Sequence, residues 1–80
     1  MDARDIIRTL IADSGYSQRQ VSQAIGRQHN FVATYISKGQ IPGLAVLSEI
    51  ADACGCDVIV RNRNNGHKWI IDPPDRNIPE

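Results

Sequence analysis

The chain has 80 residues, of which 41% are hydrophobic and 22% charged, and its formal net charge is zero. This length allows one domain with a small core. We expect no membrane span and no secretory signal, because the sequence contains neither a long apolar run nor a basic and apolar N-terminal segment. A cytoplasmic protein is therefore expected.

The first helix is predicted at residues 2–14. Asp2 and Asp5 lie near its positive N-terminal end. One face carries an apolar stripe, formed by Ala3, Ile6, Ile7, Leu10 and Ile11. Arg4 and Arg8 lie one turn apart, and we interpret them as partners of nearby acids. This helix is expected to support the two helices that follow.

The stretch from Ser17 to Gly39 has the pattern of two short helices separated by Gly26. Ser17 is a good N-cap for the first, in which Val21, Ala24 and Ile25 recur at helical spacing. The second, residues 28–37, has an apolar side with Val32, Tyr35 and Ile36. Its other side is short, polar and uncharged, with His29, Asn30, Ala33, Thr34 and Ser37. Two short helices joined by a glycine turn, the second with short hydrogen-bonding side chains, are typical of major-groove reading.

The charge distribution favours the same interpretation. No acidic residue lies between Asp13 and Glu49, whereas Arg19, Arg27 and Lys38 all lie in that interval. Local potential rather than net charge decides where a polyanion docks. The alternative, three cations on an ordinary solvated surface, stays open.

This stretch resembles the helix-turn-helix of the lambda-repressor/Cro-like family of phage and bacterial regulators. The resemblance extends over about residues 3–56. It is carried by Ser17-Gln18, Ala24, Gly26, Ile36, Lys38-Gly39, Ile41-Pro42 and the helical run Leu44, Leu47, Ile50 and Ala51. It implies a four-helix DNA-binding domain that reads a double-stranded operator, commonly as a two-fold dimer. Many members have one residue fewer between the two glycines, so the register of the second helix stays open by one position.

Site residues follow from this arrangement. An Asn amide can pair with adenine, and an Ala or Thr methyl can contact the thymine methyl. The predicted base-reading residues are Gln28, His29, Asn30, Ala33 and Thr34. The predicted DNA-backbone contacts are Gln18, Arg19, Arg27, Ser37 and Lys38.

A loop is predicted at residues 39–43, because Pro42 blocks helix continuation. The fourth helix is expected from Leu44 to Cys54, with Glu49 and Asp52 facing water. Its predicted buried stripe consists of Leu44, Leu47, Ile50, Ala51 and Cys54.

Cys54 and Cys56 are too close for usual disulfide geometry, and two thiols do not complete a zinc site. His67 could supply a third ligand, but the sequence offers no evident fourth. We interpret Cys54 as a small buried hydrophobe and expect reduced thiols, with no metal or other cofactor.

From Cys56 onwards the pattern alternates, which predicts a β-hairpin at residues 57–74. An Asn65-Gly66 two-residue turn would place Val60 opposite Ile71 and Asn62 opposite Trp69. One predicted face then holds Val58, Val60, Trp69 and Ile71, and the other holds Ile59, Arg61, Arg63, Lys68 and Ile70. The tail at 75–80 is expected to be frayed.

Apolar residues occur on both predicted hairpin faces, and an isolated two-stranded ribbon is marginal in water. At least one face must therefore be covered, and if one packs on the helices, the other, with a free strand edge beside it, is available to a second copy. The predicted dimerisation residues are Val58, Ile59, Val60, Trp69, Ile70 and Ile71. A dimer through the fourth helix is the alternative.

No catalytic set, phosphate-binding glycine loop or metal-ligand cluster is evident, so no enzyme is expected. The sequence predicts a mainly α fold, with a four-helix lambda-repressor-like domain at 1–56 and a two-stranded hairpin at 57–74. The predicted function is a DNA-binding regulator, a homodimeric repressor that reads a palindromic operator with helix 28–37. The alternative is a protein-binding module on the same scaffold, such as an anti-CRISPR protein or an antitoxin.

Overall fold

The computed structural model describes residues 1–74, and the predicted frayed tail at 75–80 lies outside the described residues. Four helices precede one antiparallel hairpin, which confirms the predicted layout. Their bounds are α1 Ala3–Ser14, α2 Gln18–Ala24, α3 Phe31–Ser37, α4 Leu44–Ala53, β1 Val58–Arg61 and β2 Lys68–Ile71.

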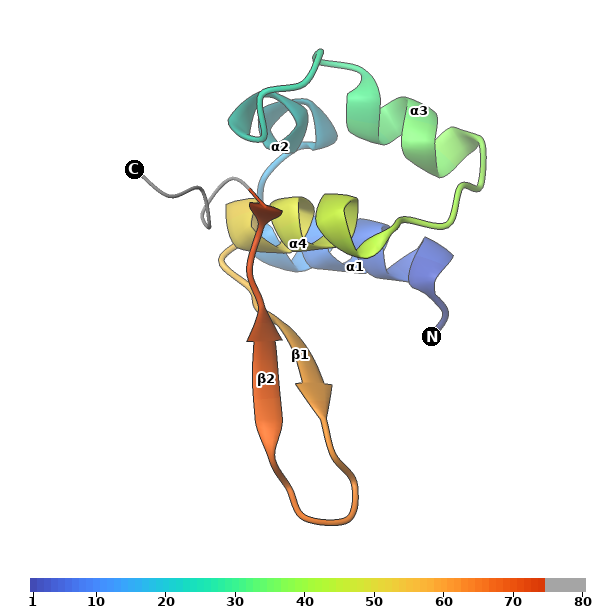
Figure 1. Cartoon of the computed structure of the whole chain (residues 1–80). Helices are drawn as coiled ribbons and strands as arrows, with labels where there is room; N and C mark the ends of the chain where they lie inside the picture. Colours follow the sequence, from blue (N-terminus) through green and yellow to red (C-terminus); the bar gives the residue numbers. More distant parts are fainter. Residues whose placement is uncertain (75–80) are drawn as a thin grey trace.

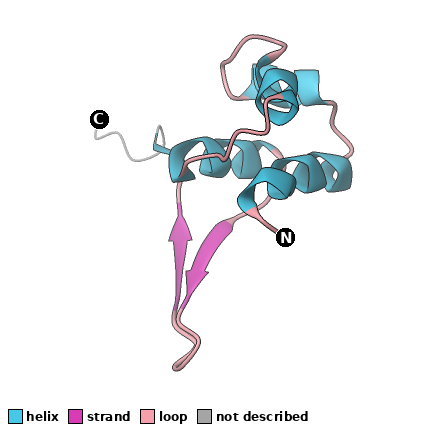
Figure 2. Cartoon of the chain, turned by 90° about the vertical axis from the view of Figure 1, so that its right-hand side faces the viewer, coloured by secondary structure: helices cyan, strands magenta, loops and turns pink. Residues whose placement is uncertain are grey.

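The elements form three tiers (Figures 1 and 2). Helices α2 and α3 lie at one end, α1 and α4 cross the middle, and the hairpin extends away on the far side. The core lies between the two helical tiers and contains the buried side chains of Ile7, Ile11, Val21, Val32 and Ile50. The apolar contacts of the α2–α3 pair with the rest of the protein therefore lie on its inner side.

Helix α1 begins one residue later than predicted, because Asp2 is its N-cap. The Asp2 side chain accepts a 2.8 Å hydrogen bond from the backbone N–H of Arg4 and also pairs with the Arg4 guanidinium at 2.8 Å. These hydrogen bonds lower the pKa of the Asp2 carboxyl. The predicted pairing of Arg4 with an acid is thus confirmed.

Helix α4 differs from the prediction in which side chains it buries. Leu44 is 59% exposed, because it is the first helical residue and lies at the end of the preceding loop, whereas Pro42 and Ser48 are buried. The expectation that Glu49 faces water is wrong, since its side chain is only 16% exposed and pairs with Arg27. One side of α4 therefore faces the turn between α2 and α3.

Cys54 is the C-cap of α4 and is half-buried rather than fully enclosed. Burial raises the pKa of its thiol. Cys54 and Cys56 both carry free thiols.

The hairpin pairs in a different register from the predicted one. Val60 lies opposite Trp69, and Val58 lies opposite Ile71. The Asn62 side-chain oxygen accepts a 2.9 Å hydrogen bond from the Asn64 N–H, so the connection is longer than a two-residue Asn-Gly turn. The slip is two residues, and because side chains alternate with period two, the strand residues keep their predicted faces. Arg63, predicted on the face of Ile59, lies in the loop instead.

Both hairpin faces are largely exposed, so neither face packs along the helices. Ile59 and Val60 are each 49% exposed although they point to opposite faces. Among the strand residues, only those next to the helical body, Val58 and Ile71, are half-buried. The ribbon leaves the body too steeply to lie across α1 or α4 (Figure 1).

One buried hydrogen bond joins the two helices of the upper tier. The hydroxyl of Ser22 in α2 accepts a 3.0 Å hydrogen bond from the backbone N–H of Val32 in α3 and donates at 2.8 Å to the carbonyl of Gln18. Ser22 and Val32 are both 0% exposed. The bond therefore satisfies an N–H group of the first turn of α3 that water does not reach.

Replacing Ser22 with alanine is expected to lower the free energy of unfolding by about 1–3 kcal/mol, because the buried Val32 N–H loses its partner. Urea unfolding measures this change. Thr9→Ala is the matched control, since the Thr9 hydroxyl also donates to a carbonyl four residues earlier but is exposed; it should change stability by less than about 0.5 kcal/mol. Similar losses in both variants would contradict this role for Ser22.

Candidate nucleic-acid interface

The entry to α2 is fixed by a capping box. The Ser17 hydroxyl accepts from the Gln20 N–H at 3.0 Å, and the Gln20 side-chain oxygen accepts from the Ser17 N–H at 2.9 Å. This reciprocal pair satisfies two backbone donors at the helix start. It leaves the neighbouring side chains of Gln18 and Arg19 outside the capping interaction.

The turn between α2 and α3 depends on Gly26. Its φ is 75°, a left-handed conformation that side chains disfavour. Gly26 N–H donates to the Gln23 carbonyl at 3.0 Å, and Arg27 N–H donates to the Ser22 carbonyl at 2.9 Å. These are the two hydrogen bonds of a Schellman motif, which closes α2 and reverses the chain toward α3.

Helix α3 begins at Phe31, so the predicted span of 28–37 is too long at its N-terminus. Gln28 and His29 lie in a turn before the helix, and Asn30 is the N-cap. The Phe31 N–H donates to the Gln28 carbonyl at 3.0 Å, which is a three-residue step rather than a helical one. The Ser22–Val32 hydrogen bond fixes this start, because it ties the second residue of α3 to α2.

The turn and the outer side of α3 bring most of the predicted base-reading residues together. Their side chains are exposed except for Thr34, which is half-buried; the set is Gln28, His29, Asn30, Ala33 and Thr34. Asn30 forms no side-chain capping bond, so its amide is available to a ligand. Val32 points inward on the same helix and is fully buried. The surface is thus polar, uncharged and mounted on a fixed backbone.

Arg27 is held within the protein. Its guanidinium lies 3.6 Å from a carboxylate oxygen of Glu49 and 4.9 Å from the centroid of the Phe31 ring. That oxygen of Glu49 is buried and has no hydrogen-bond partner among residues 1–74. Arg27 thus bridges α4 and the first residue of α3, and Glu49 partly neutralises a cation predicted to face DNA.

An open groove of about 450 Å³ runs beside α3. The Phe31 and Tyr35 rings, with centroids 5.6 Å apart, form its apolar part. The polar part comes from Arg27, Gln28, Asn30, Thr34 and Gln40. The groove therefore adjoins the predicted base-reading surface and belongs to it.

Two exposed cations lie near this surface in sequence, Arg19 at the start of α2 and Lys38 at the end of α3. Within residues 1–74, neither Arg19 nor Lys38 forms an ion pair. Ser37, next to Lys38, is also exposed, although its hydroxyl donates to the Thr34 carbonyl at 3.1 Å. Phosphate oxygens are suitable ligands for two such exposed cations.

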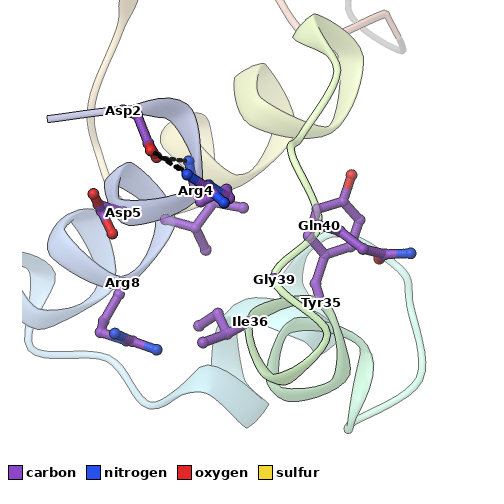
Figure 3. Close-up of a pocket in the computed structure, with 9 residues that line it drawn as sticks. Asp2, Arg4, Asp5, Arg8, Tyr35, Ile36, Gly39 and Gln40 are labelled. Carbon is purple, nitrogen blue, oxygen red and sulfur yellow. Dashed lines mark hydrogen bonds and ion pairs between the residues drawn. The ribbon is translucent and has the colours of Figure 1, made fainter.

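A second hollow, of about 310 Å³, lies between the start of α1 and the end of α3 (Figure 3). Arg4 reaches Asp2 across its rim, whereas Arg8 extends on the side of Ile36. Among the described residues Arg8 forms no ion pair, so its predicted pairing with an acid is wrong. Arg8 adds another unpaired cation on the α1 side of α3.

Comparisons with protein-family models, with curated proteins and with solved structures find no match to this chain. In the part of the chain that the structure describes, no helix is both long and apolar enough to cross a membrane.

Sequence reasoning missed three residues that build this surface: Ser22, Phe31 and Glu49. Ser22 carried a detectable signal, because it lies one turn before Ile25 on the apolar side of α2, where a hydroxyl needs a partner. Glu49 carried none. Its proximity to Arg27 arises only when α4 packs under the turn.

Arg27→Ala is expected to lower the free energy of unfolding by about 1–2 kcal/mol, because the buried Glu49 oxygen loses the cation that pairs with it. Chemical denaturation measures this effect in the absence of any ligand. Lys38→Ala is the control and should change stability by less than about 0.5 kcal/mol, since it removes an exposed charge. Equal stability of both variants would mean that the bridge has no structural role.

Proposed function

We propose that this protein is a sequence-specific DNA-binding transcriptional regulator, a repressor of the lambda-repressor-like type. The turn before α3 and the outer side of α3 enter the major groove. The observation that carries the proposal is the exposed, uncharged polar surface around Asn30, together with two exposed cations, Lys38 at the end of α3 and Arg19 at the start of α2, that form no ion pair among the described residues. Base edges require short hydrogen-bonding groups, and phosphates require cations.

The roles divide by position. Asn30 and Thr34 are assigned to base edges, and Ala33 to a thymine methyl group. Arg19 and Lys38 are assigned to phosphates, together with Gln18 and Ser37. Arg27 is assigned mainly to orienting the start of α3, because Glu49 and Phe31 already hold its guanidinium.

The second candidate is a protein-binding module of the anti-CRISPR or antitoxin kind. The observation that favours it is the groove with Phe31 and Tyr35, since aromatic side chains are common anchors in protein interfaces. The most exposed aromatic residues, Tyr16 and Trp69, lie outside α3, which weakens this candidate. The two functions differ in salt dependence, because DNA binding releases counterions and a dry protein interface does not.

Asn30→Ala is expected to weaken binding to the preferred duplex by about 1–3 kcal/mol and binding to random duplex much less. The preferred duplex is first selected from a random library, and fluorescence anisotropy then measures both affinities at one salt concentration. Asn64→Ala makes the same chemical change in the hairpin loop, at the opposite end of the molecule, and should alter neither affinity. Equal losses on both duplexes would exclude base reading by Asn30.

Lys38→Ala and Arg19→Ala are each expected to weaken binding to all duplexes alike. Each should reduce the slope of log affinity against log salt by about one unit, because one phosphate contact is lost. A salt titration measures the slope. Lys68→Ala removes the same charge from the hairpin and should leave the slope unchanged. An unchanged slope in Lys38→Ala would place that side chain away from the phosphates.

A further inference from the structure

Most apolar side chains of the hairpin are poorly covered. Its largest side chains remain in solvent, with Trp69 54% and Ile70 56% exposed. It points away from α2 and α3 in both views (Figures 1 and 2). A DNA duplex bound at α3 would therefore lie at the other end of the molecule and could not cover these residues.

The two hairpin faces differ in charge. Residues directly opposite each other on paired strands share a face, so the observed register assigns each side chain. The uncharged face consists of Val58, Val60, Trp69 and Ile71. The mixed face consists of Ile59, Arg61, Lys68 and Ile70.

We infer that two copies of this chain pair face to face through their uncharged faces, with the two-fold axis running along the hairpins. Sheets pack in this way at a separation of about 10 Å, with their side chains interdigitated. Trp69 and Val60, which lie opposite each other on the two strands, would form the centre of the contact. Large aromatic side chains are frequent energetic anchors of such interfaces.

Charge selects the face. Symmetric pairing through the mixed face would bring Arg61 and Lys68 of one copy close to the same cations of the other. Burying like charges without partners costs far more than an apolar contact of this size provides. The uncharged face carries no such penalty, and the same pairing turns both sets of cations outward.

The direction of the axis rests on the proposed function. Both α3 helices must meet one duplex, and α3 lies at the opposite end of the molecule from the hairpin tip (Figure 1). A two-fold axis along the hairpins places the two α3 helices at the same end. An axis across the hairpins would place them at opposite ends, where one dimer would face two separate duplexes.

The size of the ribbon sets the strength of the pairing. A face of two four-residue strands is much smaller than the roughly 800 Å² per partner of a standard interface. The dimer is therefore expected to dissociate on dilution and to be favoured when two half-sites lie on the same duplex.

Two adjacent residues provide a matched test. Val60 and Ile59 have the same exposure, 49%, and lie on the same strand but on opposite faces. Sedimentation equilibrium over a range of concentrations, without DNA, gives the dimer dissociation constant of the full chain, Val60→Glu and Ile59→Glu. Val60→Glu should weaken dimerisation at least about tenfold, equivalent to about 1.4 kcal/mol. Ile59→Glu should resemble the unmodified chain.

Circular dichroism verifies that the helices of each variant remain folded. Three results would overturn the inference: an unmodified chain that is monomeric up to submillimolar concentration, a Val60→Glu chain that still dimerises, or two variants that lose dimerisation equally. The last result would mean that pairing does not depend on one face.

A second measurement separates this inference from the proposed function. The mass of the complex with the selected duplex gives its stoichiometry, and one dimer on one duplex is expected. One dimer on two duplexes would overturn the axis direction while leaving DNA binding intact. A dimer that fails to bind any duplex would instead overturn the proposed function and leave the pairing through the uncharged face in place.

Discussion

The burial of Val32 is the constraint on which the functional surface depends. Its side chain completes the core formed with α1, α2 and α4, and its N–H donates to the hydroxyl of Ser22. An apolar contact alone would allow α3 to slide or rotate by a fraction of a turn, because such contacts are not directional. The hydrogen bond removes that freedom, since a misplaced α3 would leave a buried donor unpaired. The orientation of Asn30 and Thr34 therefore follows from two interactions on the opposite side of the same helix.

Arg27 and Glu49 connect this surface to the rest of the body. Glu49 belongs to α4, Arg27 lies in the connection between α2 and α3, and Phe31 is the first residue of α3. Three elements thus meet through one side chain. A cation in this position performs a structural task before any ligand arrives, whereas Arg19 and Lys38 have no such internal partner among the described residues. Cations of similar sequence context therefore divide into one that shapes the surface and others that remain available to phosphates.

The hairpin and the helices differ in how much apolar surface they bury. Its hydrogen bonds hold two strands together, but neither face gains the apolar burial that stabilises the helical tiers. Apolar side chains of the four helices meet in one core, although Ile41 and Leu44 at the entry to α4 remain exposed. The exposed hairpin faces and the polar surface of α3 lie at opposite ends of a small molecule (Figure 1).

Local patterns in the sequence were sufficient for the four helices, the hairpin and the composition of its two faces, because helical and strand periodicities depend on neighbouring residues alone. They also placed Val32 inward and Asn30 outward. Tertiary structure decided the rest. The start of α3 at Phe31 depends on a hydrogen bond from Ser22, ten residues away in sequence. The burial of Glu49 depends on how α4 packs beneath the turn, and the hairpin register depends on the side-chain hydrogen bonds of Asn62. The exposure of both hairpin faces depends on the direction in which the ribbon leaves the body, and no periodicity encodes that direction.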